Sequence, residues 1–297
     1  MAIKQEISCR YFGIGGLTIR VEADLPITDI TFNEKLKAFE EGGPGDDMIV
    51  IRHHFSLPDP ESLGLGQLMY RQRPWAIYRQ ADSWIYLGIL DETGNKDLFQ
   101  IAIFNNEHSQ ADIYHRNSDV FSKGGCASLT LFPTDQILLA RVLADRAGFY
   151  LHSCGVDFNG QGLLFAGHSE AGKSTMARML AGQAKILCDD RIIIRNHPEG
   201  ARIYGTWHHG DVPDILPASV PLQAILFLEK APENRLILME DRAEIMRRLL
   251  ACIIRPFVTA DWWAKSLDIL ERTAGTIPCY VLKCDKSGAV VDLLKKL

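Results

Sequence analysis

The chain has 297 residues, of which 47% are hydrophobic and 23% charged, and its formal net charge is −5. Such a composition is typical of a globular protein with one large domain or two modest ones. The negative charge argues against nucleic acid or an anionic membrane as a partner. The start, "MAIKQEISCRYFG", lacks the apolar core of a secretory signal, and no apolar run reaches the length of a membrane span. We therefore expect a cytoplasmic protein with neither kind of partner.

The first part of the chain, residues 1–130, is predicted to be a β-rich domain. Short segments rich in Ile, Val, Tyr, Phe and Trp alternate there with turn residues, as strands with one wet face do. These segments are residues 16–23, 47–55, 75–80, 83–91 and 97–105. The pair His53 and His54 suggests metal binding at first sight, but neighbouring strand positions face opposite sides of a sheet. We interpret the pair as structural.

The second part, residues 131–297, mixes helical and strand patterns, so the fold class predicted for the chain is α+β or α/β. Predicted helices cover residues 133–150, 173–182, 242–255, 260–274 and 290–296. Predicted strands cover 151–158, 163–167, 185–190, 191–196, 201–207, 222–229 and 280–284. Asn159-Gly160 is a strong signal for a hairpin turn. The cysteines form no CxxC pattern, which favours buried free thiols over zinc ligands or disulfides. They are Cys9, Cys126, Cys154, Cys188, Cys252, Cys279 and Cys284.

The stretch "GHSEAGKST" fits the P-loop pattern G-x-x-x-x-G-K-[ST], also called Walker A, between a predicted strand and a predicted helix. In such a loop, glycines let backbone N–H groups face a polyphosphate, and the helix N-terminus favours the same anion. Lys173 is expected to reach the outer phosphates and Ser174 to bind Mg²⁺. Glu170, unusual beside phosphates, is expected to face solvent or a partner. The predicted nucleotide-binding residues are Gly167, His168, Ser169, Glu170, Ala171, Gly172, Lys173, Ser174 and Thr175.

Two further features lie close to this loop in the sequence. Asp189 and Asp190 follow the apolar run "KILC", and two carboxylates at a strand end suit a Mg²⁺ site in which one binds the ion and the other acts as a base. An ordinary acidic turn remains the alternative. His152 precedes the predicted hairpin, and a histidine alone is more often structural than catalytic.

Together, "LHSCGVDFNGQGLLFAGHSEAGKST…ILCDD" resembles the core of the bacterial HPr kinase/phosphorylase family, best over residues 148–195. The resemblance implies a phosphoenolpyruvate-carboxykinase-like P-loop fold and the phosphorylation of a protein serine with ATP and Mg²⁺. It assigns His152 to the active-site histidine, Lys173 and Ser174 to phosphate and metal, Asp189 to the base, and Asp190 to the metal.

The sequence departs from that family at several places. Glu170 stands where a glycine is usual, Thr175 stands where an acid is usual, and the family's Arg-Gly-Leu-Gly-type signature is absent. The N-terminal part also differs from the family's regulatory domain, which puts HPr as the substrate in doubt, and likewise the phosphorylase reaction and the hexamer. In place of the signature stands "GTWHHGD", whose Trp207, His208, His209 and Asp211 are candidate substrate contacts. The alternative is a core tryptophan beside solvent-facing histidines.

These patterns predict an ATP- and Mg²⁺-dependent, HPr-kinase-like enzyme. It would transfer the γ-phosphoryl group to a hydroxyl, serine foremost, of a peptide, protein or small molecule. The alternatives are a nucleotide-binding regulatory protein that transfers nothing and an ATPase or GTPase switch; no Asn-Lys-x-Asp guanine signature occurs. The identity of the acceptor and a homo-oligomeric state stay open. Arg191, Arg247 and Arg255 are candidates for an arginine that assists transfer.

Overall fold

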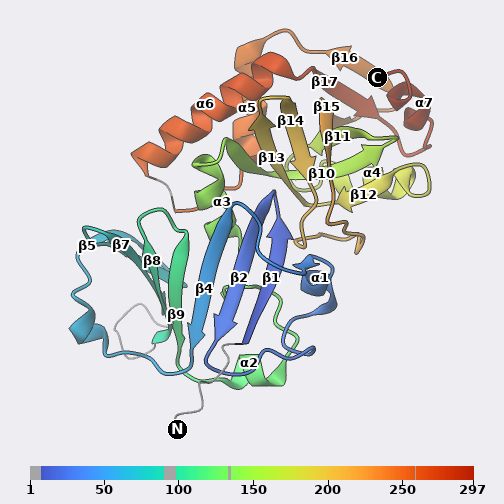
Figure 1. Ribbon diagram of the computed structural model, residues 1–297. Helices are drawn as coiled ribbons and strands as arrows, with labels where there is room; N and C mark the ends of the chain where they lie inside the picture. The colour runs from blue at the N-terminus through green and yellow to red at the C-terminus, as the bar shows by residue number, and fades with distance from the viewer. Residues whose placement is uncertain (1–7, 90–97, 133–134, 258) are drawn as a thin grey trace. The chain divides into compact units, whose positions relative to one another are not determined.

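The structure is a computed structural model that describes residues 8–89, 98–132, 135–257 and 259–297 (Figure 1). It has a mixed α/β architecture with two large sheets and few helices. The chain divides into two compact units, Met1–Leu138 and Leu139–Leu297, and the division falls within helix α3 (Gln136–Ala144). No helix of the described ranges combines the length and apolar character needed to cross a membrane. The ends of two predicted strands, at residues 90–91 and 97, and the start of the predicted helix at 133–134 lie outside the described residues.

The N-terminal unit contains a nine-stranded sheet in the order β3-β1-β2-β4-β9-β8-β7-β6-β5. The pairs β2–β4 and β4–β9 are parallel, whereas the other pairs are antiparallel. Its strands are β1 (Ser8–Ile14), β2 (Leu17–Ala23), β3 (Glu40–Glu41), β4 (Met48–His54), β5 (Gln67–Gln72), β6 (Trp75–Arg79), β7 (Ser83–Ile89), β8 (Leu98–Asn105) and β9 (Gln110–His115). Three short helical segments join them: α1 (Glu34–Lys37), η1 (Pro60–Leu63) and α2 (Asp119–Lys123). Strands β2, β4, β6, β7 and β8 coincide with the predicted segments, and the other four strands were not predicted.

The two neighbouring histidines of β4 face opposite sides of this sheet. His53 is fully buried, and its Nδ1 lies 2.8 Å from Nε2 of the buried His115 on β9. His54 lies on the other face between two carboxylates, 2.9 Å from Asp24 and 3.1 Å from Asp112. Both rings thus have partners within the sheet and its loops, which fits the structural interpretation.

The C-terminal unit contains an eight-stranded sheet in the order β11-β10-β13-β14-β15-β17-β16, with β12 added beside β10 and a further pairing of β11 with β15. Its strands are β10 (Gly148–Phe158), β11 (Gln161–Ala166), β12 (Lys185–Cys188), β13 (Arg191–His197), β14 (Gly200–Tyr204), β15 (Ser219–Lys230), β16 (Arg235–Leu238) and β17 (Cys279–Cys284). Its remaining helices are α4 (Lys173–Leu180), α5 (Arg242–Cys252), α6 (Ala260–Thr276) and α7 (Val290–Leu294).

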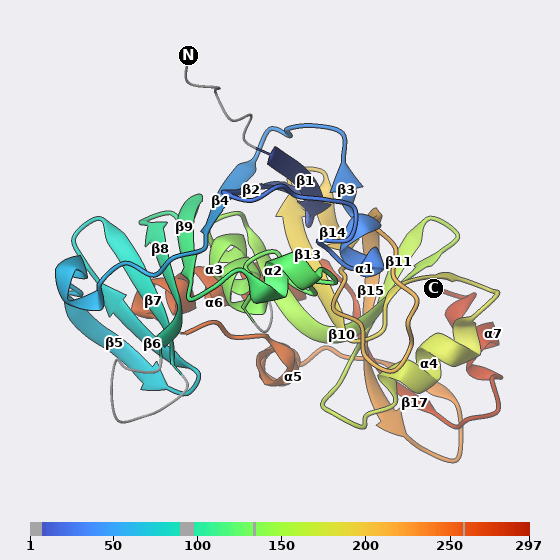
Figure 2. The same cartoon turned by 90° about the horizontal axis from the view of Figure 1, so that it is seen from below.

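Strand β11 is buried on both faces, which explains its continuous apolar sequence "LLFA". Leu164 and Ala166 belong to one core cluster, with α5 and α6, whereas Leu163 and Phe165 belong to the other, with α4 and α7. Figures 1 and 2 show α4 and α7 close together, apart from α5 and α6. The chain that leaves β11 therefore emerges between two layers of helices.

Three predicted boundaries in this unit are wrong, and β16 was not predicted. The strand predicted over residues 201–207 ends at Tyr204, so Trp207 lies in the chain that follows β14. The helix predicted over residues 133–150 ends at Ala144, because Ala147 adopts a positive φ of 51° and β10 begins at Gly148. Tyr150 is consequently a strand residue. The helix predicted over residues 242–255 ends at Cys252, and Ile253 instead forms a β-bridge with Leu151.

Candidate functional site

The glycine-rich loop, Gly167–Gly172, joins the end of β11 to the start of α4. Gly172 caps the helix with a φ of 111°, a conformation that favours glycine. Glu170 also has a positive φ, 67°, although it carries a side chain. The middle of the loop is turned to solvent, since His168, Ser169 and Glu170 are exposed, whereas Ala171 packs into the core. The strand–loop–helix context predicted from the sequence is present.

Lys173 is buried at the base of this loop. Its side chain is 6% exposed, and its Nζ donates hydrogen bonds to the carbonyl oxygens of Gly167 and His168, each at 3.0 Å. Burial lowers the pKa of Lys173 below its usual range, while the negative charge of Asp190 opposes that shift. The cation is thus anchored by the loop it belongs to. Ser174 and Thr175 lie in the first turn of α4 and are partly exposed.

Two cysteines, which have no chemical role in the sequence analysis, lie at the base of the loop. The Cys252 thiol, at the end of α5, hydrogen-bonds with the backbone of Gly167, and burial raises the pKa of that thiol. Cys154 on β10 is fully buried near Lys173, and burial raises its pKa well above the usual range. Both thiols therefore stay neutral and pack against the loop as small apolar groups. All seven cysteines are free, as expected.

Asp190 lies where β12 passes into β13, and both of its carboxylate oxygens have basic partners. Oδ1 lies 2.7 Å from Nε2 of His152, and Oδ2 lies 2.6 Å from Nη1 of Arg191. Burial alone would raise the pKa of Asp190, but the hydrogen bond to His152 and the charges of Arg191 and Lys173 outweigh it and hold the pKa below its usual range. The structure thus joins His152, predicted from the sequence, to the second aspartate.

Asp189 faces a different set of partners and is fully buried. Its Oδ1 accepts a hydrogen bond from the backbone N–H of Gly210 at 2.6 Å, and its Oδ2 accepts one from the N–H of Val212 at 3.0 Å. The two adjacent aspartates therefore divide their contacts: Asp190 binds side chains, and Asp189 binds the backbone of another segment.

That segment, Thr206–Val212, carries "TWHHGD" and is called the histidine loop below. Thr206 donates a hydrogen bond from Oγ1 to the carbonyl of Arg191 at 2.7 Å, and the Cys188 thiol donates to the carbonyl of His208 at 3.3 Å. On the other side, the hydroxyl of Tyr150 lies 2.8 Å from Nδ1 of His208. The histidine loop is therefore attached along the whole stretch Cys188–Arg191. Sequence reasoning missed Tyr150 because it assigned that residue to a helix.

The four candidate contacts on the histidine loop differ in exposure. Trp207 is 4% exposed, whereas Asp211 is exposed. Burial, together with the charge of Arg191, lowers the pKa of His208 to about 3, so this ring is neutral at physiological pH. His209 Nδ1 donates to the carbonyl of Gly210 at 2.7 Å, so in the neutral ring Nε2 is the acceptor nitrogen. That Nε2 is buried and has no hydrogen-bond partner among the described residues.

Of the three candidate arginines, Arg191 lies at this site through its ion pair with Asp190. Arg247 instead pairs with Glu244 on its own helix, and its side chain is 73% exposed. Arg255 is exposed after the end of α5. The structure therefore brings Arg191 alone of these three into contact with the predicted site residues.

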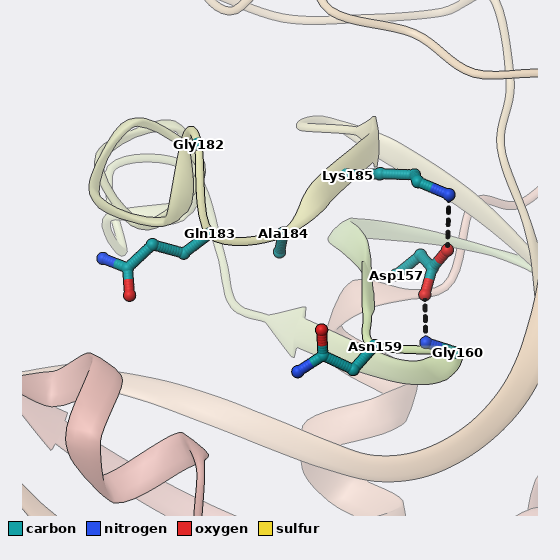
Figure 3. A pocket seen from close by; sticks show the side chains of 7 residues that line it. All are labelled: Asp157, Asn159, Gly160, Gly182, Gln183, Ala184 and Lys185. Atoms are coloured by element: carbon teal, nitrogen blue, oxygen red, sulfur yellow. Dashed lines mark hydrogen bonds and ion pairs between the residues drawn. The ribbon is translucent and has the colours of Figure 1, made fainter.

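Figure 3 shows a pocket that lies elsewhere in this unit. Its volume is about 590 Å³, and it is lined by the β10–β11 turn, with Asn159 and Gly160, and by Gly182–Lys185 after α4. Lys185 and Asp157 form an ion pair of 3.7 Å at its wall. Because that turn precedes β11 and the glycine-rich loop follows it, the pocket lies at the opposite end of the strand from the candidate site.

Fold and site together define a mixed α/β protein in which a glycine-rich strand–loop–helix junction, a His–Asp–Arg cluster and the histidine loop converge. Comparison with protein families matches residues 134–297 to the family described as "ScmC: SynChlorMet cassette protein ScmC". The match covers more than half of the chain and includes every residue of the candidate site. The chain belongs to the ScmC family. A search of curated proteins finds no match.

Proposed function

We propose that this chain is an ATP- and Mg²⁺-dependent kinase of the HPr-kinase-like type, with Gly167–Ser174 as its P-loop. It transfers the γ-phosphoryl group of ATP to a hydroxyl of a peptide, protein or small molecule, with serine the foremost candidate. The observation that carries the proposal is the buried Lys173, which is hydrogen-bonded to its own loop and lies within electrostatic reach of Asp190. The resemblance of residues 148–195 to HPr kinases supports the same reading.

The residues present fit Mg²⁺ and a polyphosphate. A buried ammonium group held by two carbonyls is suited to an anion, because phosphate oxygens replace carbonyl oxygens as charge-assisted partners. No group of three or more His, Cys, Asp or Glu placed to hold a metal occurs within the described ranges. Mg²⁺ does not require such a group, since it is usually held by one or two carboxylates together with substrate phosphates. Asp190 and the Ser174 hydroxyl would supply the protein ligands.

In this proposal the protein positions groups and balances charge. The bound metal would neutralise charge that develops on the phosphate oxygens. Lys173 and the loop amides orient the γ-phosphoryl group, and Arg191, released from Asp190, stabilises its charge. The acceptor oxygen forms a bond to the γ-phosphorus while the bond from that phosphorus to the bridging oxygen of ADP breaks. The proton of the acceptor hydroxyl passes to Nδ1 of His152, whose Nε2 faces Asp190 Oδ1 across a 2.7 Å contact that is already in place.

This assignment differs from the role expected for Asp189. A base must reach the hydroxyl, but both oxygens of Asp189 accept backbone hydrogen bonds inside the protein. The same observation favours the alternative, a nucleotide-binding regulator or ATPase switch that transfers nothing to a hydroxyl acceptor. The family's description as a cassette protein makes the other products of such a cassette the first acceptors to test.

ADP formation from Mg·ATP, measured with and without candidate hydroxyl acceptors, separates the two functions. A kinase forms ADP faster when the acceptor is present and yields a phosphorylated acceptor that mass spectrometry detects. An ATPase switch forms ADP at the same rate in both cases, and a pure regulator binds Mg·ATP without forming ADP. If neither binding nor turnover of Mg·ATP occurs, the proposed function is wrong.

A further inference from the structure

The division of contacts between Asp189 and Asp190 points to separate roles for two carboxylates that share one sequence motif. Asp189 is fully buried, yet its partners are two backbone N–H groups of the histidine loop, which is irregular chain between β14 and β15. Placing a carboxylate in the interior is costly unless its oxygens are hydrogen-bonded. Both oxygens are satisfied by residues 20 or more positions away in sequence, so the carboxylate fixes this segment rather than its own turn.

We propose that Asp189 is a positioning residue that holds the histidine loop against Asp190, on the side where the hydroxyl substrate binds. This inference rests on the proposed function, because it names the element that positions the hydroxyl acceptor. Asp189 itself touches neither nucleotide nor acceptor. It acts through the backbone of Gly210 and Val212 and thereby sets the position of His209, whose Nε2 is an acceptor nitrogen without a described partner.

Close packing around Gly210 supports this role. A Cβ atom at Gly210 would lie 3.2 Å from Asp189 Oδ2 and 3.2 Å from the Cβ of Asp190, so the loop backbone lies directly against both aspartates. These distances are tighter than ordinary van der Waals contact. A side chain at this position would push the histidine loop away from the carboxylates without changing any charged group.

The main variant is Asp189→Asn. An asparagine offers one acceptor oxygen and places an NH₂ group against the other backbone N–H, so one loop amide loses its partner. We expect hydrogen exchange of the Gly210 and Val212 amides, followed by NMR on the full chain, to become about 10- to 100-fold faster, the range for losing a hydrogen bond to a charged group. Mg·ATP affinity, measured by calorimetry, is expected to stay within about threefold of wild type. In ATP hydrolysis with water as the acceptor, kcat falls while KM for Mg·ATP is unchanged.

Gly210→Ala is the second variant, and it keeps every charge. It is expected to change amide exchange and kcat in the same direction as Asp189→Asn but less strongly. Gly43→Ala is the matched control, since a Cβ there meets nothing within 4 Å. A purely stabilising role for Asp189 would instead lower Mg·ATP affinity and kcat together.

The outcomes separate the two proposals. Unchanged exchange of the Gly210 and Val212 amides in Asp189→Asn overturns the positioning role. A loss of Mg·ATP affinity in Asp189→Asn as large as that in Asp190→Asn also overturns it, because Asp189 would then act on the nucleotide. If the wild type neither binds nor hydrolyses Mg·ATP, the kinase proposal fails, whereas the amide exchange still decides whether Asp189 holds the loop.

Discussion

The two units of this chain both bury polar side chains, but they arrange them differently. In the N-terminal unit, buried His53 contacts both His115 and the Leu129 carbonyl, and buried Asp135 accepts from the N–H groups of Leu129 and Thr130, so these groups meet at one short segment. In the C-terminal unit, buried Lys173 and Asp189 contact the backbone of loops, and the partly buried Asp190 gathers His152 and Arg191. Burial of polar groups by itself therefore does not mark a functional site. We base the proposed site on the convergence of several segments on those groups.

Asp135 illustrates the structural use of a buried carboxylate in the N-terminal unit. It is fully buried, and it accepts hydrogen bonds from the backbone N–H of Leu129 at 2.8 Å and of Thr130 at 2.9 Å. Its partners lie within seven residues in sequence, so it closes a local turn. Asp189 uses the same chemistry on a segment more than 20 residues away in the sequence.

The largest expected effect is the loss of Lys173. The variant Lys173→Ala should greatly weaken or abolish ATP turnover, because a charge-assisted contact to phosphate contributes about 1.5–3 kcal/mol and charge increases in the transition state. Lys185→Ala is the matched control, since Lys185 is an exposed lysine at the start of β12, after α4 has ended. An ADP-release assay compares the two variants. Turnover by Lys173→Ala at the wild-type rate would refute the P-loop assignment.

The second effect concerns the histidines of the N-terminal unit. Burial lowers the pKa of His53 to about 3, and burial with the charge of His54 lowers that of His115 to about 4. Both values lie below the unfolded value near 6.5, so the unfolded chain binds more protons and stability falls as the pH drops below about 6.5. The expected slope is about 1.4 kcal/mol per pH unit for each histidine. Hydrogen exchange in β4 and β9, measured between pH 7 and pH 4, follows this loss.

The variants His53→Gln and His54→Gln sharpen this prediction because the residues are neighbours with opposite shifts. Glutamine can accept from His115 and donate to the Leu129 carbonyl, as the neutral His53 ring does, but it does not titrate. His53→Gln should therefore reduce the slope of the free energy of unfolding against pH below about 6.5.

For His54, burial would lower the pKa, but hydrogen bonds to Asp112 and Asp24 outweigh it and raise the pKa. The stabilisation from His54 is fully present below about pH 6.5 and is lost as the pH rises above it, so His54→Gln should lower stability at acid pH without steepening the slope below pH 6.5. Equal slopes in both variants would contradict the structural account.

The smallest effect is expected at Glu170. Its φ of 67° costs a residue with a side chain about 1–2 kcal/mol, of which the entropy of a glycine offsets about 0.5–1 kcal/mol. Glu170→Gly should therefore raise the free energy of unfolding slightly, by about 0.5–1 kcal/mol, and leave Mg·ATP affinity equal or better. Ser169→Gly, which has no positive φ to relieve, should destabilise instead. A large loss of nucleotide affinity in Glu170→Gly would show a direct role for the acid.

The sequence predicted the elements that depend on local patterns, and it failed where distant contacts decide. The Asn159-Gly160 hairpin and the strand–loop–helix junction were foreseen because turn chemistry and glycine spacing are local. The end of the helix near Ala147 was not, since a positive φ at alanine leaves no sequence signal. The contacts of Asp189 and Tyr150 could not be predicted either. Both depend on the histidine loop, whose attachment to Cys188–Arg191 is a tertiary contact between separate segments.

The central claim is that the glycine-rich loop and Asp190 together bind Mg·ATP. The most direct measurement is calorimetric titration of ATP into the wild type and into Asp190→Asn, at several Mg²⁺ concentrations. The account predicts Mg²⁺-dependent binding to the wild type, and weaker binding to Asp190→Asn that needs more Mg²⁺. Absence of ATP binding to the wild type, or an Asp190→Asn variant with the same Mg²⁺ dependence, would contradict it.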